Sequence, residues 1–372
     1  ALMSESELRP LPATQPQSAM TMPSLGEREA LIYLVQDARR AGVVIGDARG
    51  WRWYREIDPG SLREASIALQ NLLAAGHSDA REIDRAKRTL EAALAWPLGM
   101  HEPPARLRVV VDSRLADIPW AILSAPGETS PLVETTEIEL LQSLSSVVDA
   151  FPEPTSVHAL GAARAVGSLG ELTSVSAELE AIAGAWSGAH VVLRSAATRD
   201  DLLTALAVPG AIVHLAAHGR GDRGLAEDAG LWLAQGGADT PAFVSTLRLR
   251  TSPIAASTVV LAACESGRSE TTRAGGGGGV AGALIDAGAR VVVGTRWPVG
   301  DRSAARFSAL FHEHLATKPD APSAALRHAL IALRREPPHR HPNHWAGWFL
   351  LARGTPREAA NAAPREFGSS RD

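Results

Sequence analysis

The sequence is poor in cysteine, lysine and long apolar runs, and each shortage excludes something. Cys264 is the only cysteine among 372 residues, so no internal disulfide can form and a cytoplasmic location is expected. Lysine occurs only at Lys87 and Lys318, which we interpret as codon bias. No apolar run approaches the roughly 20 residues that a membrane helix needs, and the N-terminus lacks the pattern of a secretory signal. We therefore expect no membrane association.

The remaining composition is that of an ordinary globular protein. Hydrophobic residues make up 45% of the chain and charged residues 21%. The formal net charge of −4 provides no basic footprint, so nucleic acid is not expected as a direct partner. The length predicts two domains, or one large domain with an extension.

Shifts in composition divide the chain into four parts. Residues 1–24 are rich in Pro, Ser, Thr and Gln and predict a disordered leader. Residues 25–100 predict a helical segment, with helices starting near Glu27 and covering 60–75 and 79–95. Residues 101–355 form the main domain. Residues 356–372 predict a disordered tail.

In the main domain, short apolar runs alternate with helical patterns. This alternation predicts an α/β/α sandwich around a mostly parallel sheet. The strands are apolar throughout, as expected when helices cover both faces. Thr198 and Asp201 form a plausible capping box. The expected strands are 107–111, 191–193, 211–215, 258–262 and 290–293, and the expected helices are 174–186, 198–207, 279–288 and 302–315.

Two of these apolar strands end in residues that carry chemistry. One run finishes in His218-Gly219 and the other in Cys264. If the strands are parallel neighbours, their ends lie about 4.8 Å apart, and a thiol and an imidazole placed there suffice for nucleophilic acyl transfer. The amides of Gly219 and Cys264 would form an oxyanion hole. For Cys264 taken alone, an inert core residue is the better interpretation; the pairing with His218 favours catalysis.

The segments around these residues resemble the CHAT domain family, caspase-like peptidases related to caspases and separase. The resemblance covers about 60–355, with its motifs in the family's order. The matching segments are HLAAHG (214–219), LAACESG (261–267), the glycine loop with its WPV turn (275–301), HPNHWAGWFLLARG (341–354) and DSRLADIPWAIL (112–123).

The resemblance implies a caspase-like fold and a cysteine endopeptidase that works through a thioester without metal or cofactor. His218 matches the general base, Cys264 the nucleophile, and Gly219 with the Cys264 amide the oxyanion hole. It also implies a regulated prokaryotic immunity or cell-death protease with antiviral defence as its setting. Its partners would be a protein substrate, such as a gasdermin-like effector, and an activating or sensor protein. The WPV turn continues Gly300-Asp301 where many relatives have two acids, and LAAC replaces LSAC.

Three carboxylates are candidates for the substrate pocket. Asp301 follows a strand and a tight turn, and a buried carboxylate there would select a basic P1 residue. Asp301 could equally be the N-cap of the helix beginning at Arg302. Asp222 and Glu265 are the weaker candidates for the same pocket.

Two other patterns, a glycine run and a group of histidines, are weak indications of nucleotide binding and of metal binding. The spacing Gly277, Gly279, Gly282 satisfies a dinucleotide fingerprint, but about ten residues separate it from the preceding strand. A mobile or processed loop fits the glycine run better. His339, His341 and His344 are close in sequence, but prolines interrupt them and zinc sites need a fixed scaffold, so we expect no metal site.

Functions of another class remain open at this stage. The chain could be a catalytically silent CHAT module that keeps the fold and binds a partner protein, but the intact His218 and Cys264 pair argues against this. A nucleotide-dependent enzyme would have to use the glycine run.

Overall fold

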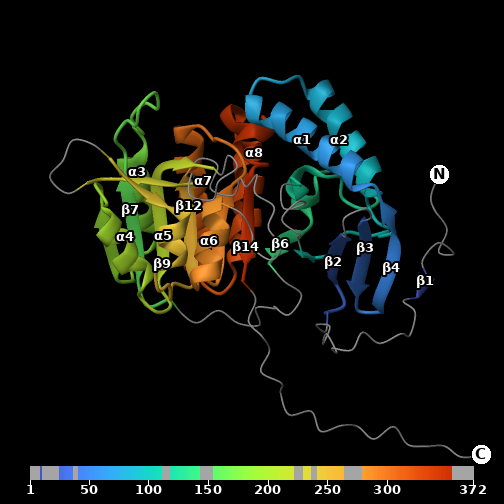
Figure 1. Ribbon diagram of the computed structural model, residues 1–372, viewed down its shortest axis with the longest axis horizontal. Coiled ribbons are helices and arrows are strands. Elements are labelled where there is room, and N and C mark those ends of the chain that lie inside the picture. The colour runs from blue at the N-terminus through green and yellow to red at the C-terminus, as the bar shows by residue number, and fades with distance from the viewer. Residues whose placement is uncertain are drawn as a thin grey trace, which may run out of the picture.

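A single sheet runs through the computed structural model (Figure 1). The structure describes residues 9–10, 25–36, 41–110, 118–142, 154–221, 229–235, 241–263 and 279–353. Within these residues the sheet has 14 strands in the order β1-β4-β3-β2-β5-β6-β14-β13-β12-β9-β10-β11, and β7 and β8 continue it from β9. The leader expected at 1–24, apart from β1, and the tail expected at 356–372 lie outside the described residues.

The strands of this sheet are β1 (Arg9–Pro10), β2 (Glu29–Gln36), β3 (Ala41–Asp47), β4 (Gly50–Ile57), β5 (Arg106–Val110), β6 (Glu137–Leu141), β7 (Val157–Ala162), β8 (Val191–Arg194), β9 (Ile212–Arg220), β10 (Gly230–Leu233), β11 (Ala242–Ser245), β12 (Thr258–Ala263), β13 (Val291–Thr295) and β14 (Trp348–Ala352). The α-helices are α1 (Pro59–Ala75), α2 (Ala80–Leu94), α3 (Val175–Ala185), α4 (Arg199–Leu206), α5 (Thr246–Arg250), α6 (Gly279–Ala287), α7 (Asp301–Thr317) and α8 (Pro322–Arg335). Short 3-10 helices are η2 (Trp120–Ile122), η3 (Leu132–Glu134), η5 (Pro337–His339) and η6 (Pro342–His344).

The central strands confirm the predicted α/β/α sandwich. β7, β8, β9, β12 and β13 are parallel to their neighbours in this group, and the antiparallel strands β14 and β10 flank them. Strand β12 is buried along nearly its whole length because helices cover both faces. All five strands and all four helices expected in the main domain are present. Sequence reasoning missed β6, β7, β10, β11, β14, α5 and α8.

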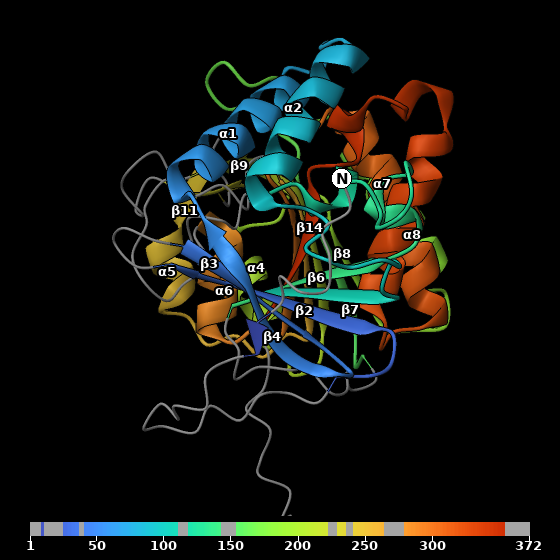
Figure 2. The same ribbon diagram turned by 90° about the vertical axis from the view of Figure 1, so that its right-hand side faces the viewer.

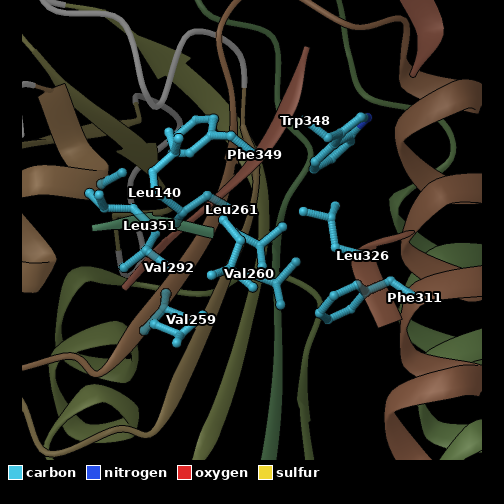
Figure 3. Packing of buried hydrophobic residues seen from close by; sticks show 14 of the residues in the cluster. Leu140, Val259, Val260, Leu261, Val292, Phe311, Leu326, Trp348, Phe349 and Leu351 are labelled. Carbon is cyan, nitrogen blue, oxygen red and sulfur yellow. The ribbon is translucent and has the colours of Figure 1, made fainter. Parts of the chain in front are cut away.

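The core lies between the sheet and its helices (Figure 3). Phe311 of α7 and Leu326 of α8 point toward the sheet on the side where Trp348 lies. Phe349 and Leu351 lie on the opposite side, because successive side chains of a strand alternate between faces. This alternation lets one strand, β14, contribute to both halves of the core.

The helix expected near Glu27 is wrong, because this part of the chain forms the strands β2, β3 and β4. Leu31 and Ile32, adjacent in sequence, are both fully buried, which requires a strand covered on both faces. A short apolar run such as ALIYLV gives no periodicity that separates a buried strand from a helix. β2 pairs with β5, so the N-terminal strands belong to the same sheet as the main domain.

The two helices expected at 60–75 and 79–95 are confirmed as α1 and α2, which lie side by side (Figure 2). Asp58 caps α1 by accepting hydrogen bonds from the amides of Gly60 and Ser61, and Gly76 ends it with φ of 74°. Ile83, Leu90 and Leu94 recur at helical spacing and form the buried face of α2. In the described part of the chain, no helix combines the length and the apolar character needed to cross a membrane.

Candidate active site

Strands β9 and β12 end side by side, as the sequence predicts. They are parallel, and their register continues to the pair Ala217 and Ala263. His218 follows Ala217 in the same strand, and Cys264 is the next residue of the sequence after Ala263. Cys264 itself lies outside the described residues. The register therefore confirms the neighbouring strands on which the predicted pairing depends.

His218 is held in one orientation by the main chain. Its side chain is 5% exposed, and its Nε2 lies 2.9 Å from the carbonyl oxygen of Gly170. A carbonyl oxygen only accepts, so Nε2 must carry the proton and donate it. In the neutral imidazole Nδ1 is then the nitrogen with a free lone pair, which is the atom able to take a proton. Gly170 lies in the loop between β7 and α3, and no motif around it predicts its hydrogen bond with His218.

The remaining predicted catalytic groups can be placed only in part. Gly219 pairs with Leu231 of β10 in the antiparallel ladder next to His218. Its role in an oxyanion hole stays a prediction, because the second donor, Cys264, is outside the described residues. Asp222 and Glu265, the weaker pocket candidates, and Gly277 of the glycine run are outside them as well.

A small cavity lies at the ends of β9 and β12. It has a volume of about 20 Å³, and Ala217 and Ala263 contribute to its wall. Two carboxylates, Glu178 and Asp301, line it together with the apolar residues. On this volume measure about 10–15 Å³ holds one water molecule, so the cavity takes a group of about that size. The structure thus brings Asp301 to the ends of the candidate catalytic strands.

Asp301 is bound to the start of a neighbouring helix and does not cap its own. Its Oδ2 accepts hydrogen bonds from the amide of Ser174, at 2.8 Å, and from the hydroxyl of Thr173, at 3.3 Å. The N-cap of α7 is Gly300, and no side-chain cap bond is present there. The interpretation of Asp301 as an N-cap is therefore wrong. Its carboxylate instead fixes the beginning of α3 against α7.

Glu178 ends a buried chain of hydrogen bonds that sequence reasoning missed. The indole of Trp186 donates to Nδ1 of His312 at 3.1 Å, Nε2 of His312 lies 3.1 Å from Nδ1 of His214, and Nε2 of His214 lies 2.9 Å from Oε1 of Glu178. An indole N–H can only donate, so each histidine in turn accepts at Nδ1 and donates at Nε2. The hydrogen bonds of the chain thus all run in one direction, from Trp186 toward Glu178.

Burial favours the neutral form of His312 in this chain. Desolvation, followed by the neighbouring His214, lowers the pKa of His312 well below its ordinary value of 6.5. His214 and Glu178 are nearly inaccessible to solvent, with side chains 0% and 2% exposed. Only the contact between α3, β9 and α7 assembles these residues, which explains why no local sequence signal predicts them.

The histidines near the C-terminus have partners other than a metal. The hydroxyl of Ser303 lies 3.1 Å from Nδ1 of His339 and 2.9 Å from Nδ1 of His344. Nε2 of His341 lies 3.2 Å from the carbonyl oxygen of Ser78. Among the residues that the structure describes, no three His, Cys, Asp or Glu side chains gather as metal ligands would.

Comparison with solved structures gives two kinds of similar protein. Separase of Saccharomyces cerevisiae, in complex with securin, is similar with a TM-score of 0.58 and 10% sequence identity, covering 89% of this chain and 30% of that chain. RgpB of Porphyromonas gingivalis, whose structure is described as the Arg specific cysteine proteinase gingipain R, has a TM-score of 0.45 and 12% identity over 80% of this chain and 75% of that chain. A search of curated proteins gave no match.

The separase match shows a similar fold, and its 10% identity leaves the activity open. The sequence itself is matched by the family model of the CHAT domain over residues 83–353. This match spans most of the 372 residues and includes the ends of both β9 and β12. The chain therefore belongs to the CHAT domain family.

Proposed function

We propose that the chain is a cysteine endopeptidase in which Cys264 is the nucleophile and His218 the general base. The observation that carries the proposal is the parallel register of β9 and β12, which pairs Ala217 with Ala263 immediately before the two residues. The hydrogen bond from His218 to Gly170 supports it, because it leaves Nδ1 as the proton acceptor. An imidazole oriented by a third group is a recurring feature of activated nucleophiles.

The proposed reaction has two steps. Nδ1 of His218 takes the proton of the Cys264 thiol, and the thiolate attacks the scissile carbonyl carbon to form a carbon–sulfur bond. The carbon–nitrogen bond breaks, and the imidazolium returns its proton to the leaving amine. Water, deprotonated by His218, then hydrolyses the thioester and releases the acid and the thiol. The amides of Gly219 and Cys264 would stabilise the oxyanion in both steps.

We assign the cavity beside the strand ends to the P1 side chain of the substrate. Its two carboxylates, Glu178 and Asp301, have no Lys or Arg partner among the described residues. Carboxylates in a site shielded from water favour a cation that can donate hydrogen bonds to them. We therefore propose a basic residue at P1, with its charged end directed at this cavity.

The biological setting is proposed from the family. Members of the CHAT family resemble caspases in serving prokaryotic immunity and cell death, and a regulated protease that cleaves an effector, such as a gasdermin-like protein, fits that setting. An activating or sensor protein would be its second partner.

The dyad is tested by cleavage of candidate effectors encoded near this chain, with the new termini mapped by mass spectrometry. We expect Cys264→Ala and His218→Ala each to abolish cleavage while the proteins keep the wild-type circular dichroism spectrum. His158→Ala, a histidine of the adjacent strand β7, serves as the matched control and should retain activity. Cleavage that persists in either dyad variant would exclude the proposed chemistry.

A further inference from the structure

A wide groove lies between helix α2 and the C-terminal end of α8, and it shares no lining residue with the cavity at the ends of β9 and β12. Its volume is about 830 Å³, within the range of roughly 300–1,000 Å³ that ligand pockets occupy. Figures 1 and 2 show the α1–α2 hairpin beside the C-terminal part of the chain. Residues of α2, of the segment around η2 and of α8 with η6 line the groove.

The charge of the groove is opposite to that of the whole chain. Among the described lining residues, Lys87, Arg334, Arg335 and Arg340 are basic, and Asp84 alone is acidic. The chain as a whole has a formal net charge of −4. Positive charge concentrated in a concave site on an acidic protein attracts anionic groups and increases their rate of association.

Part of this charge is already compensated. Arg334 and Arg335 both pair with Glu134, and the ammonium of Lys87 donates to the hydroxyl of Ser124 at 3.1 Å. Arg340 is exposed and makes no ion pair with a described residue. The Arg335 side chain is 68% exposed, so it too can contact a ligand.

The apolar part of the groove distinguishes between anionic ligands. Ile83, Ile122 and Pro342 line it, as does Trp345, which is 2% exposed and lies against the guanidinium of Arg334. Proteins that bind single-stranded nucleic acid add exposed aromatic rings on which bases stack. The indole in the described lining is thus covered, His341 is the other ring there, and the aliphatic residues suit apolar side chains.

The groove walls are fixed by hydrogen bonds, so little ordering is required on binding. Glu91 of α2 accepts a hydrogen bond from the backbone amide of Ser124 at 2.7 Å. The indole of Trp96 donates to the carbonyl oxygen of Ser124 at 2.6 Å. On the other side, the side-chain Nδ2 of Asn343 in η6 donates to the carbonyl oxygen of Leu73 in α1 at 2.9 Å. A preformed site loses less free energy to conformational ordering than a flexible one.

We propose that this groove binds an acidic peptide segment of a partner protein, with its carboxylates near Arg335 and Arg340 and its apolar side chains against the groove floor. The proposal concerns binding alone and holds whether or not the chain is a peptidase.

The test measures fluorescence anisotropy of a labelled short peptide in which Glu and Leu alternate, added to the full chain. We expect saturable binding that weakens as NaCl is raised, because exposed charges are screened by salt. Arg340→Glu should weaken binding by about tenfold or more, since it replaces an attraction by a repulsion. Arg85→Glu, an exposed residue of α2 outside the groove lining, is the matched control and should leave binding unchanged.

Two comparison probes make the result decisive. A peptide with Gln in place of Glu should bind weakly, and an oligothymidylate of equal charge should not compete with the Glu-Leu peptide. The absence of peptide binding, an equal loss in Arg340→Glu and Arg85→Glu, or preferential binding of the oligothymidylate would each overturn the proposal. None of these readouts depends on catalysis, so its failure is distinguishable from failure of the peptidase assignment.

Discussion

The Nε2 of His218 and the carbonyl oxygen of Gly170 lie 2.9 Å apart, and this one contact decides which nitrogen of the imidazole is free. The loop that carries Gly170 leads into α3, whose first residues are bound by Asp301. The orientation of the candidate base and the position of the candidate pocket carboxylate are therefore set by the same segment of chain.

The single cysteine allows the reactivity of one thiol to be measured directly. We expect Cys264 in the wild-type chain to react with iodoacetamide near pH 6.5 about tenfold faster than in His218→Ala, because the imidazole increases the thiolate fraction of a group whose ordinary pKa is about 8.5. Alkylation rates followed by intact mass, with His158→Ala as the control, measure the effect. Equal rates in wild type and His218→Ala would mean that the two residues do not interact.

The pocket carboxylates should determine preference at P1. We expect Asp301→Asn and Glu178→Gln to lower kcat/KM for substrates with Lys or Arg at P1 by about tenfold or more, because a charge-assisted hydrogen bond becomes a neutral one. Substrates with Leu at P1 should be affected much less. The measurement compares the two fluorogenic series, with Glu171→Gln, an exposed acid of the neighbouring loop, as control. A parallel loss in both series would indicate a structural role only.

The buried histidine chain should make stability fall in mild acid. The pKa of His312 is lowered in the folded state, so below about pH 6.5 the unfolded chain binds a proton that the folded chain rejects, and the free energy of unfolding decreases as pH falls. Between pH 6.5 and 5.5, we expect the free energy of unfolding of His312→Gln to fall by about 1 kcal/mol less than that of the wild type.

Urea unfolding at both pH values measures this difference. Other histidines with lowered pKa values, such as His344, contribute equally to both proteins and cancel in the comparison. The exposed His77→Gln is the control and should follow the wild-type dependence. An unchanged dependence in His312→Gln would show that this histidine does not titrate on unfolding.

Arg108 should be important for the stability of the sheet where β5 lies between β2 and β6. It lies on β5, is 5% exposed, and pairs with Glu29 of β2 and Glu139 of β6, each at 3.1 Å. Removing it leaves both partly buried carboxylates with Arg106 alone, 3.4 Å from each, so we expect Arg108→Ala to lower the free energy of unfolding by about 2 kcal/mol. Arg248→Ala, at an exposed position, should change it little. Urea denaturation distinguishes the two variants, and equal small losses would contradict the prediction.

Elements with local signals were predicted well from the sequence. Helix α1 has an Asp58 cap, a proline in its first turn and a glycine at its end, and these fix its bounds without help from the rest of the fold. The strand ending before Cys264 was predicted because its residues are apolar throughout. The β2 strand was mistaken for a helix because its short apolar run has no periodicity, and its pairing with β3 and β5 involves residues distant in the sequence.

The site was predictable only where one residue carries the chemistry. His218 and Cys264 are visible in the sequence because histidine and cysteine are rare at the ends of apolar strands. Gly170 acts through its carbonyl oxygen, which every residue possesses, so no residue type indicates it. Glu178 and His312 meet only through the contact of α3 with β9 and α7.

Because the sheet is continuous, the residues matched by the family model are fewer than the residues needed for a folded domain. The family match begins at residue 83, inside α2, and so leaves out β2, which forms a full ladder with β5. A fragment cut at that boundary would present the open edge of β5 to solvent, with the buried Leu107 and Val109 beside unpaired main-chain groups. Such edges recruit strands from other molecules. Truncation at the homology boundary is therefore expected to yield an aggregating protein, whereas a fragment starting before β2 would keep that edge paired.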